Sequence, residues 1–139
     1  MPEIRFALEG DRSFWKRLDP HLPDAEFDRK VRDRQAYVLT DENEPRGLLR
    51  YSLFWDTIPF CNLLYIESES RGRGFGRAMM EYWEADMKSR GYGMLLLSTQ
   101  SDEDAQHFYR KLGYRDCGGL ILTLPGFEQP TELFFCKGL

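Results

Sequence analysis

The spacing of apolar residues changes along the chain, and each change marks a different kind of element. Apolar and polar residues alternate over Glu3–Leu8, which predicts a first strand. Apolar residues then recur at helical spacing, which predicts helices over Asp11–Leu18 and Asp24–Arg34. The next three segments are typical of strands and predict an antiparallel meander; they are Ala36–Thr40, Gly47–Trp55 and Ile58–Glu67.

Helices and strands alternate in the second half. Gly74–Arg90 carries an apolar stripe at a spacing of three and four and predicts a long helix, and the fully apolar Met94–Leu97 predicts a buried strand. A helix from Ser101 or Asp102 to Leu112 follows. Two last strands are expected at Leu120–Leu124 and Glu132–Cys136. This order predicts an α/β (α+β) fold, with a mixed, mostly antiparallel central sheet of about seven strands flanked by four helices.

Length and charge narrow the class of protein. The chain has 139 residues and no Ser/Gly/Pro-rich linker, so we expect a single domain over residues 1–139. A net charge of −4 disfavours binding to nucleic acid, which depends on neutralising phosphates. No stretch approaches the roughly 20 apolar residues of a membrane span, and the N-terminus lacks the apolar run of a signal peptide. We therefore expect a cytoplasmic location and no membrane partner.

The cysteines argue against a disulfide or a metal centre. Cys61, Cys117 and Cys136 are odd in number, widely spaced and set in apolar surroundings, without a C-x-x-C motif or a nearby histidine. We expect three small buried thiols in a reducing compartment, and no metal site.

A glycine-rich loop is the sharpest local feature. The apolar residues that end at Ile66 run into Glu67-Ser68-Glu69-Ser70, and then come Arg71-Gly72-Arg73-Gly74-Phe75-Gly76-Arg77 and the long helix. Glycines at alternate positions leave room for backbone N–H groups to converge at a helix N-terminus, and arginines add positive charge. This pattern predicts an anion site that fits a pyrophosphate. The alternative is a turn with surface arginines. Neither a Walker A loop nor a dinucleotide fingerprint matches.

Two motifs resemble those of the GNAT (N-acetyltransferase) superfamily. The loop Arg71–Gly76 is similar to the family pattern Arg/Gln-x-x-Gly-x-Gly/Ala. Downstream, Ala105–Tyr114 resembles the second family signature, A-x-x-x-Y-x-x-x-G-F/Y, with Tyr109 as its tyrosine. The two motifs stand in the order and at the separation usual for the family. The resemblance implies the acyl-CoA N-acyltransferase fold.

The resemblance also implies an acyl-CoA donor, usually acetyl-CoA, used as a co-substrate without a metal. Backbone N–H groups of the loop would bind the pyrophosphate, and the pantetheine arm would pair with backbone at the end of the preceding strand. The implied cofactor-binding residues are Tyr65, Ile66, Arg71, Gly72, Arg73, Gly74, Gly76 and Arg77.

Two residues are the catalytic candidates. The resemblance places the Tyr109 hydroxyl near the cofactor sulfur, where it would give a proton to the departing thiolate; spacing alone favours a core residue at Tyr109. Glu67 follows the apolar strand directly and is the candidate general base, with an exposed acidic loop residue as the alternative reading. Asp56 is the second choice, and a bound amine can also lose its proton through water.

Other side chains near the expected site are weaker candidates. His107 should face away from Tyr109 on its helix, and His21 lies in the connection between the first two helices. Trp55, beside Asp56 at a strand end, is a candidate for substrate contact. Phe14, Trp15, Phe27 and Phe54 could line an acceptor pocket or belong to the core.

The leading hypothesis is an acyl-CoA-dependent N-acyltransferase. It would transfer an acetyl group directly from acetyl-CoA to a primary amine of a small molecule, peptide or protein. The alternative is a catalytically inactive acyl-CoA-binding sensor module. An RNA-binding role for the Arg-Gly repeat is disfavoured because the repeat is single and the chain is acidic. Dimers are common in such families, so a homodimer is among the expected states.

Overall fold

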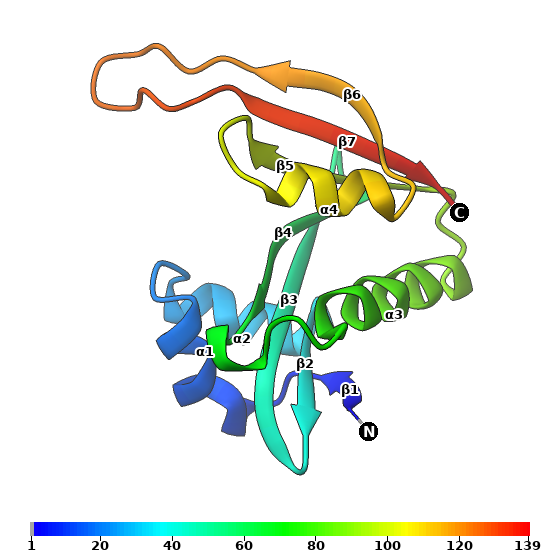
Figure 1. The fold of residues 1–139 in the computed structure, drawn as a ribbon. Coiled ribbons are helices and arrows are strands. Elements are labelled where there is room, and N and C mark those ends of the chain that lie inside the picture. Colours follow the sequence, from blue (N-terminus) through cyan, green and yellow to red (C-terminus); the bar gives the residue numbers. More distant parts are fainter. Residues whose placement is uncertain (1) are drawn as a thin grey trace. The chain divides into compact units, whose positions relative to one another are not determined.

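The computed structural model describes residues 2–139 and is drawn in Figure 1. The α-helices are α1 (Arg12–Leu18), α2 (Asp24–Arg32), α3 (Phe75–Ser89) and α4 (Ala105–Lys111), with 3-10 turns η1 (Glu9–Asp11) and η2 (Ser68–Ser70). The strands are β1 (Glu3–Phe6), β2 (Ala36–Asp41), β3 (Glu44–Phe54), β4 (Ile58–Ile66), β5 (Met94–Gln100), β6 (Arg115–Leu120) and β7 (Glu132–Gly138).

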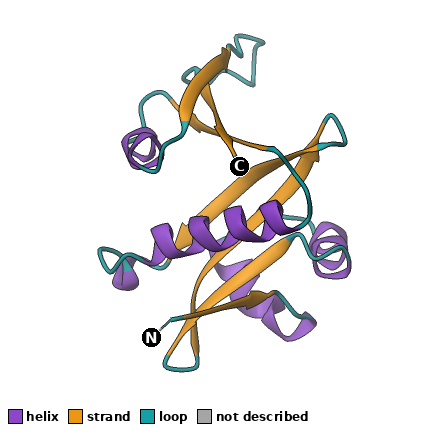
Figure 2. Ribbon diagram, turned by 90° about the vertical axis from the view of Figure 1, so that its right-hand side faces the viewer, coloured by secondary structure: helices purple, strands orange, loops and turns teal. Residues whose placement is uncertain are grey.

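The strands follow the order β1-β2-β3-β4-β5-β7-β6 in a seven-stranded sheet. The register is antiparallel for β1 with β2, β2 with β3, β5 with β7 and β6 with β7. Strands β4 and β5 are parallel, with Phe60 opposite Leu96 and Cys61 opposite Leu97. Figure 2 distinguishes these strands from the helices by colour. The predicted fold class, a mixed sheet of seven strands with four helices, is confirmed.

The chain divides into two compact units. The first contains the residues up to Ser52 together with Asn62–Asp86, and the second contains Leu53–Cys61 together with Met87–Leu139. Strands β3 and β4 and helix α3 therefore contribute residues to both units. That residues 1–139 form a single domain stays a prediction.

The core of the first unit lies between α1, α2 and the strands β2 and β3. It contains Trp15, Phe27, Val38 and Leu48, each buried, with Phe14 beside them. The rings of Trp15 and Phe27 lie 5.7 Å apart, so the two helices pack through aromatic side chains. Phe14, Trp15 and Phe27 are therefore core residues, which was one of the two readings of the sequence.

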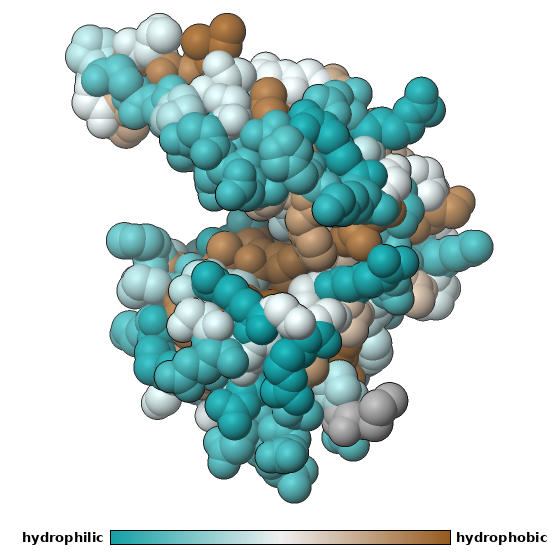
Figure 3. All heavy atoms as spheres, in the orientation of Figure 1, coloured by the Kyte–Doolittle hydropathy of each residue, from teal (hydrophilic) through white to brown (hydrophobic). Residues whose placement is uncertain are grey.

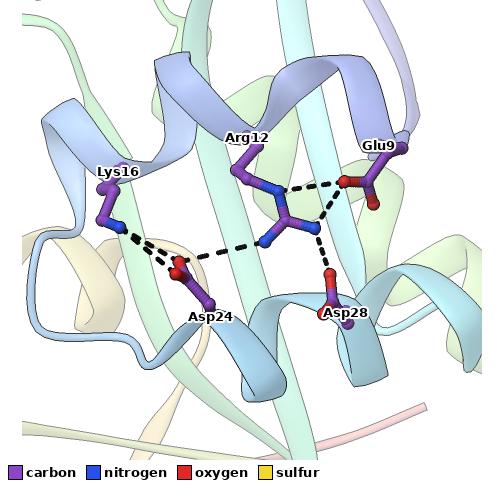
Figure 4. A network of polar contacts seen from close by, with 5 residues as sticks. All are labelled: Glu9, Arg12, Lys16, Asp24 and Asp28. Carbon is purple, nitrogen blue, oxygen red and sulfur yellow. Dashed lines mark hydrogen bonds and ion pairs between the residues drawn. The ribbon is translucent and has the colours of Figure 1, made fainter.

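Charged side chains also join α1 to α2 (Figure 4). Arg12 contacts Asp28 and lies 2.5 Å from Glu9 and 3.9 Å from Asp24. Lys16 lies 3.2 Å from the same Asp24. The hydrogen bonds that Arg12 donates to Asp28 and Glu9 raise the pKa of its guanidinium above its ordinary value. Ion pairs between charged side chains of the two helices thus link α2 to α1.

The second unit is built on the antiparallel strands β5, β7 and β6, with α4 packed against β5. Leu95, Leu97 and Phe135 are buried in it. Tyr109 of α4 and Tyr114 after it are also buried, and their rings meet edge to face at 6.0 Å. The apolar run Met94–Leu97 is therefore a buried strand, as its composition predicted.

The strand predicted at Leu120–Leu124 is wrong. The strand is β6, Arg115–Leu120, and residues 121–131 form the connection to β7. The side chains of Ile121, Leu124 and Phe127 are 65 to 72% exposed there. Figure 3 shows hydrophobic residues at the surface of this connection, at its upper left. Apolar composition alone therefore predicted the strand too far along the chain. The segment that pairs with β7 is the glycine-containing Arg115–Leu120.

Two further findings concern the whole chain. The prediction of three buried cysteines is wrong, because Cys117 is exposed and Cys136 is half-buried, and only Cys61 is buried. Across residues 2–139, no helix combines the length and apolarity that crossing a membrane requires.

Candidate functional site

The glycine-rich loop lies between the end of β4 and the start of α3, within the first unit. Gly72 and Gly74 have φ values of 78° and 80°, in the left-handed region that favours glycine. A Cβ at either position would meet no heavy atom within 4 Å. The backbone conformation, and not a steric clash, therefore disfavours a larger residue at either position. The space beside the loop is open.

The backbone N–H groups of residues 72–77 have no hydrogen-bond acceptor within the described chain. The first amide bonded into the helix is that of Ala78, which donates to the Gly74 carbonyl at 3.0 Å. Unpaired amides at a helix N-terminus form an electropositive site that suits an anion. The loop thus offers a set of unpaired donors, and its binding of a pyrophosphate stays a prediction.

The loop arginines have different partners. The Nε of Arg71 donates to the Ile66 carbonyl at 2.9 Å, and its guanidinium lies over the Tyr65 ring at 5.1 Å. Arg73 donates to Asp41 at 2.9 Å, and Arg77 pairs with Glu81 at 2.8 Å. Arg71 thereby closes the loop onto the end of β4, and carboxylates balance the charges of Arg73 and Arg77.

Strands β3 and β4 approach closely beside the loop. A Cβ on Gly47 would lie 2.4 Å from the Ile66 Cδ1 and 3.2 Å from the Tyr65 carbonyl oxygen. The Glu67 amide donates to the Arg46 carbonyl at 2.8 Å, which continues the contact past the end of β4. The absence of a side chain at Gly47 therefore sets where Tyr65 and Ile66 lie.

Two arginines hold the Glu67 carboxylate. Its Oε1 accepts a hydrogen bond from Arg17 at 2.7 Å, and its Oε2 lies 3.5 Å from Arg46. The Glu67 side chain is only 13% exposed. Glu67 is thus an anchored carboxylate, unlike the exposed acidic loop residue that was the alternative reading.

Glu67 also lines a small polar pocket between the end of α1 and the end of β4. The pocket has a volume of about 160 Å³. Its lining residues are Arg17, Leu18, Tyr65, Glu67, Ser68 and Glu69. It is large enough for a small polar group such as an amine, and both acidic and basic side chains reach it.

Tyr109 belongs to the second unit and is 8% exposed. Burial, and after it the neighbouring Cys61 thiol and Glu103 carboxylate, raise the pKa of the Tyr109 phenol well above its ordinary value. The phenol therefore keeps its proton at neutral pH, as a proton donor must.

The remaining candidates lie at the surface. His21 and His107 are exposed, and the latter faces away from the core as its helical spacing predicted. Asp56 and Trp55 occupy the turn between β3 and β4, both with positive φ, and Trp55 is 77% exposed. Among residues 2–139, no three His, Cys, Asp or Glu side chains are grouped to hold a metal ion.

Sequence reasoning missed Arg17, Arg46 and Asp41. Arg17 stands 50 positions before Glu67, and Asp41 stands 32 positions before Arg73. No local motif links residues so far apart. Asp41 directly follows the predicted strand Ala36–Thr40, but the sequence does not show that it lies near the glycine-rich loop.

A family model described as "Acetyltransferase (GNAT) domain" matches residues 32–116. Among curated proteins, the uncharacterized protein YxbD of Bacillus subtilis is 32% identical over 79 residues, which are 56% of this chain and 48% of that protein. N-alpha-acetyltransferase 80 of Mus musculus is 49% identical over 45 residues, which are 32% of this chain and 13% of that protein. The chain thus spans at most about half the length of these two relatives.

Solved structures share the fold over nearly the whole chain. Ard1 from Thermoplasma volcanium superposes with a TM-score of 0.84 at 18% identity, covering 99% of this chain and 97% of that one. A GNAT family acetyltransferase from Elizabethkingia anophelis with acetyl-CoA bound gives 0.77 at 15% identity, covering 99% and 98%. At these identities the likeness establishes the fold, the acyl-CoA N-acyltransferase fold that the two sequence motifs implied.

Proposed function

Because the chain belongs to the GNAT acetyltransferase family, we propose that it transfers an acetyl group from acetyl-CoA directly to a primary amine. The single observation that carries this proposal is the set of unpaired amides over residues 72–77 at the start of α3. The acceptor is an amine of a small molecule, peptide or protein. We further propose that this acetyltransferase acts in the cytoplasm.

The pyrophosphate of acetyl-CoA would accept hydrogen bonds from the loop amides. Gly72 and Gly74 hold the left-handed conformation that favours glycine, and neither glycine has a side chain to block an approaching phosphate. Arg73 and Arg77 would add charge by exchanging their carboxylate partners for phosphate oxygens. Gly76 lies in the first turn of α3, where its amide adds a donor.

The backbone of Tyr65 and Ile66 would orient the pantetheine arm. The Ile66 carbonyl is bonded to Arg71, and the Gly47 contact fixes the position of both residues. A rigid strand end is suited to place a thioester, since positioning lowers the barrier to attack.

Glu67 would position the acceptor amine in the polar pocket and take up its proton. Its carboxylate is held by Arg17 and Arg46, so it lies in one defined place beside Tyr65. The amine nitrogen forms the new bond to the acetyl carbon, and the bond from that carbon to sulfur breaks. Tyr109 would protonate the departing thiolate, because its phenol carries a proton at neutral pH.

The proposal is tested by thermal unfolding and thiol release. Acetyl-CoA should raise the melting temperature, as a ligand of the native state does, and free thiol should appear with at least one member of an amine panel. Replacing Gly74 by valine should remove both effects. Gly126→Val is the matched control, because Gly126 also has a positive φ but lies in the β6–β7 connection.

Two outcomes would contradict the assignment. Stabilisation without thiol release on a broad amine panel would indicate a sensor module that holds acyl-CoA without catalysis. Equal stabilisation of the Gly74→Val variant and the native sequence would show that the pyrophosphate lies elsewhere.

A further inference from the structure

Two of the three cysteines meet on neighbouring strands of the second unit. In the antiparallel register of β6 with β7, Arg115 is opposite Cys136 and Gly118 is opposite Phe134. The register shifts between Asp116 and Gly118, so Cys117 is the residue at the irregularity. The two thiols are neighbours, and Cys136 is among the groups that raise the pKa of the Cys117 thiol.

Both thiols face an open apolar groove. The groove has a volume of about 530 Å³, and Cys117 and Cys136 are among its lining residues, with Phe54, Trp55, Leu96 and Phe134. Cys117 is exposed and Cys136 is half-buried, so small reagents can reach the pair. The lining residues include no charged side chain to repel an approaching reagent.

The third cysteine provides the contrast. Cys61 is buried and pairs in register with Leu97, which is also buried. A buried thiol in such surroundings is inert, whereas accessible thiols exchange with disulfides. The three cysteines are therefore not equivalent, although the sequence suggested that they were.

We propose that Cys117 and Cys136 are a covalent modification site, oxidised to an intramolecular disulfide by low-molecular-weight disulfides of the type RS–SR. The thiolate of one cysteine attacks a sulfur of RS–SR, forms a mixed disulfide and releases one RS⁻. The thiolate of the second cysteine then attacks the protein sulfur of that mixed disulfide and releases the second RS⁻. Each RS⁻ takes up a proton given by one cysteine thiol, so the protein loses two hydrogens and two RSH are formed.

The bond would close the base of the β6–β7 connection. Residues 121–131 lie between the two strands that carry the cysteines. A crosslink across this long connection restricts the unfolded chain, so the oxidised protein should have a higher melting temperature. Reduction with dithiothreitol should reverse the increase.

The chain suits a direct test with oxidised glutathione as the probe. Burial, and then the neighbouring Cys136 and Asp116, raise the pKa of the Cys117 thiol, so the incubation is run above neutral pH, where thiolate forms. Remaining thiols are blocked with N-ethylmaleimide after denaturation, and trypsin is added. Cleavage after Arg115 and Lys137 gives residues 116–137 with both cysteines, and cleavage after Arg50 and Arg71 gives residues 51–71 with Cys61.

The expected result is a peptide 116–137 that is two hydrogens lighter and carries no maleimide, and a peptide 51–71 that is fully blocked. Cys117→Ser and Cys136→Ser should each retain a glutathione adduct on the remaining cysteine, because no second thiol displaces it. Cys61→Ser should still form the bond. A stable glutathione adduct on the native peptide 116–137, a blocked and unoxidised peptide, or a crosslink between two chains would each overturn the proposal.

Discussion

The Arg17 guanidinium and the Glu67 carboxylate lie 2.7 Å apart and join the last turn of α1 to the end of β4. Because Arg17 is largely exposed and Glu67 is not, the pair fixes the carboxylate more than it stabilises the fold. Loss of this ion pair should therefore mainly change the KM for the amine acceptor.

Replacing Arg17 by alanine should raise KM for the amine acceptor about fivefold, the factor that corresponds to an exposed ion pair of about 1 kcal/mol. The dissociation constant for acetyl-CoA should not change. Lys16→Ala is the matched control, because Lys16 pairs with Asp24 instead. Steady-state kinetics with both substrates varied would check this prediction. A change confined to the kinetic constants for acetyl-CoA would refute it.

The contact of Arg73 with Asp41 leads to a second prediction. Arg73→Gln should raise the dissociation constant for acetyl-CoA about tenfold, because one charge-assisted contact to phosphate is lost. Titration calorimetry at two salt concentrations should show a weaker salt dependence in the variant. Arg32→Gln, which removes an exposed arginine paired with Asp33, should bind normally. Normal binding by Arg73→Gln would exclude Arg73 from the phosphate site.

Tyr109→Phe should lower kcat about a hundredfold and leave the affinity for acetyl-CoA unchanged, because only the proton donor is removed. Tyr92→Phe is the control for a tyrosine elsewhere in the same unit. Burial raises the pKa of Tyr109. Ionisation of its phenol should therefore not lower the activity of the native protein as the pH approaches 10.0, the ordinary pKa of a tyrosine. An alkaline loss of activity that Tyr109→Phe abolishes would contradict this assignment.

Asp11 should make stability depend on pH. Burial alone would raise the pKa of Asp11, but hydrogen bonds from Arg5 and the Leu8 amide outweigh burial and hold it below its ordinary 3.8. The stabilisation is therefore complete above that ordinary value and is lost as pH falls through the lower pKa of the folded state. Asp11→Asn should lower the free energy of unfolding by about 2 kcal/mol at neutral pH.

Urea unfolding at neutral pH and at about pH 2 would check the prediction, because the difference between native and Asp11→Asn proteins should narrow in acid. Asp102→Asn changes an exposed carboxylate and should show no such dependence. A difference that stays constant with pH would mean that the Asp11 carboxylate does not contribute through its charge.

Local patterns in the sequence predicted what is local in the structure. The glycine-rich loop has its amides, its positive φ values and its helix within a few positions, so its unpaired donors could be predicted from the residues alone. The Leu120–Leu124 strand failed for the opposite reason. Its apolar side chains favour a strand, but the pairing partner on β7 selects Arg115–Leu120, and such a choice depends on tertiary structure.

Contacts between distant segments could not be predicted in this way. Glu67 became a candidate through its place after a strand, but Arg17 and Arg46 reach it only because α1 and β3 fold against β4. The cysteines show the same limit. Their apolar neighbours in sequence suggested burial, whereas the irregularity between β6 and β7 exposes Cys117.

Gly47 offers a test of how packing sets the end of β4. An alanine Cβ at this position would lie 2.4 Å from Ile66 Cδ1 and 3.2 Å from the Tyr65 carbonyl oxygen. Gly47→Ala should therefore lower the free energy of unfolding by about 1 to 3 kcal/mol, the usual cost of overpacking. Gly93→Ala is the matched control, since a Cβ there would meet nothing within 4 Å.

A double-mutant cycle separates the two contacts of the added methyl group. Ile66→Val removes Cδ1, so the double variant should recover most of the stability lost in Gly47→Ala. The double variant should therefore be more stable than the sum of the two single losses predicts. Urea unfolding of the four proteins gives this energy. Additive losses would show that the Tyr65 carbonyl, not the Ile66 side chain, limits the approach of β3 to β4. In that case the backbone beside the proposed thioester site is displaced, and acetyl-CoA affinity should fall in both variants that carry alanine.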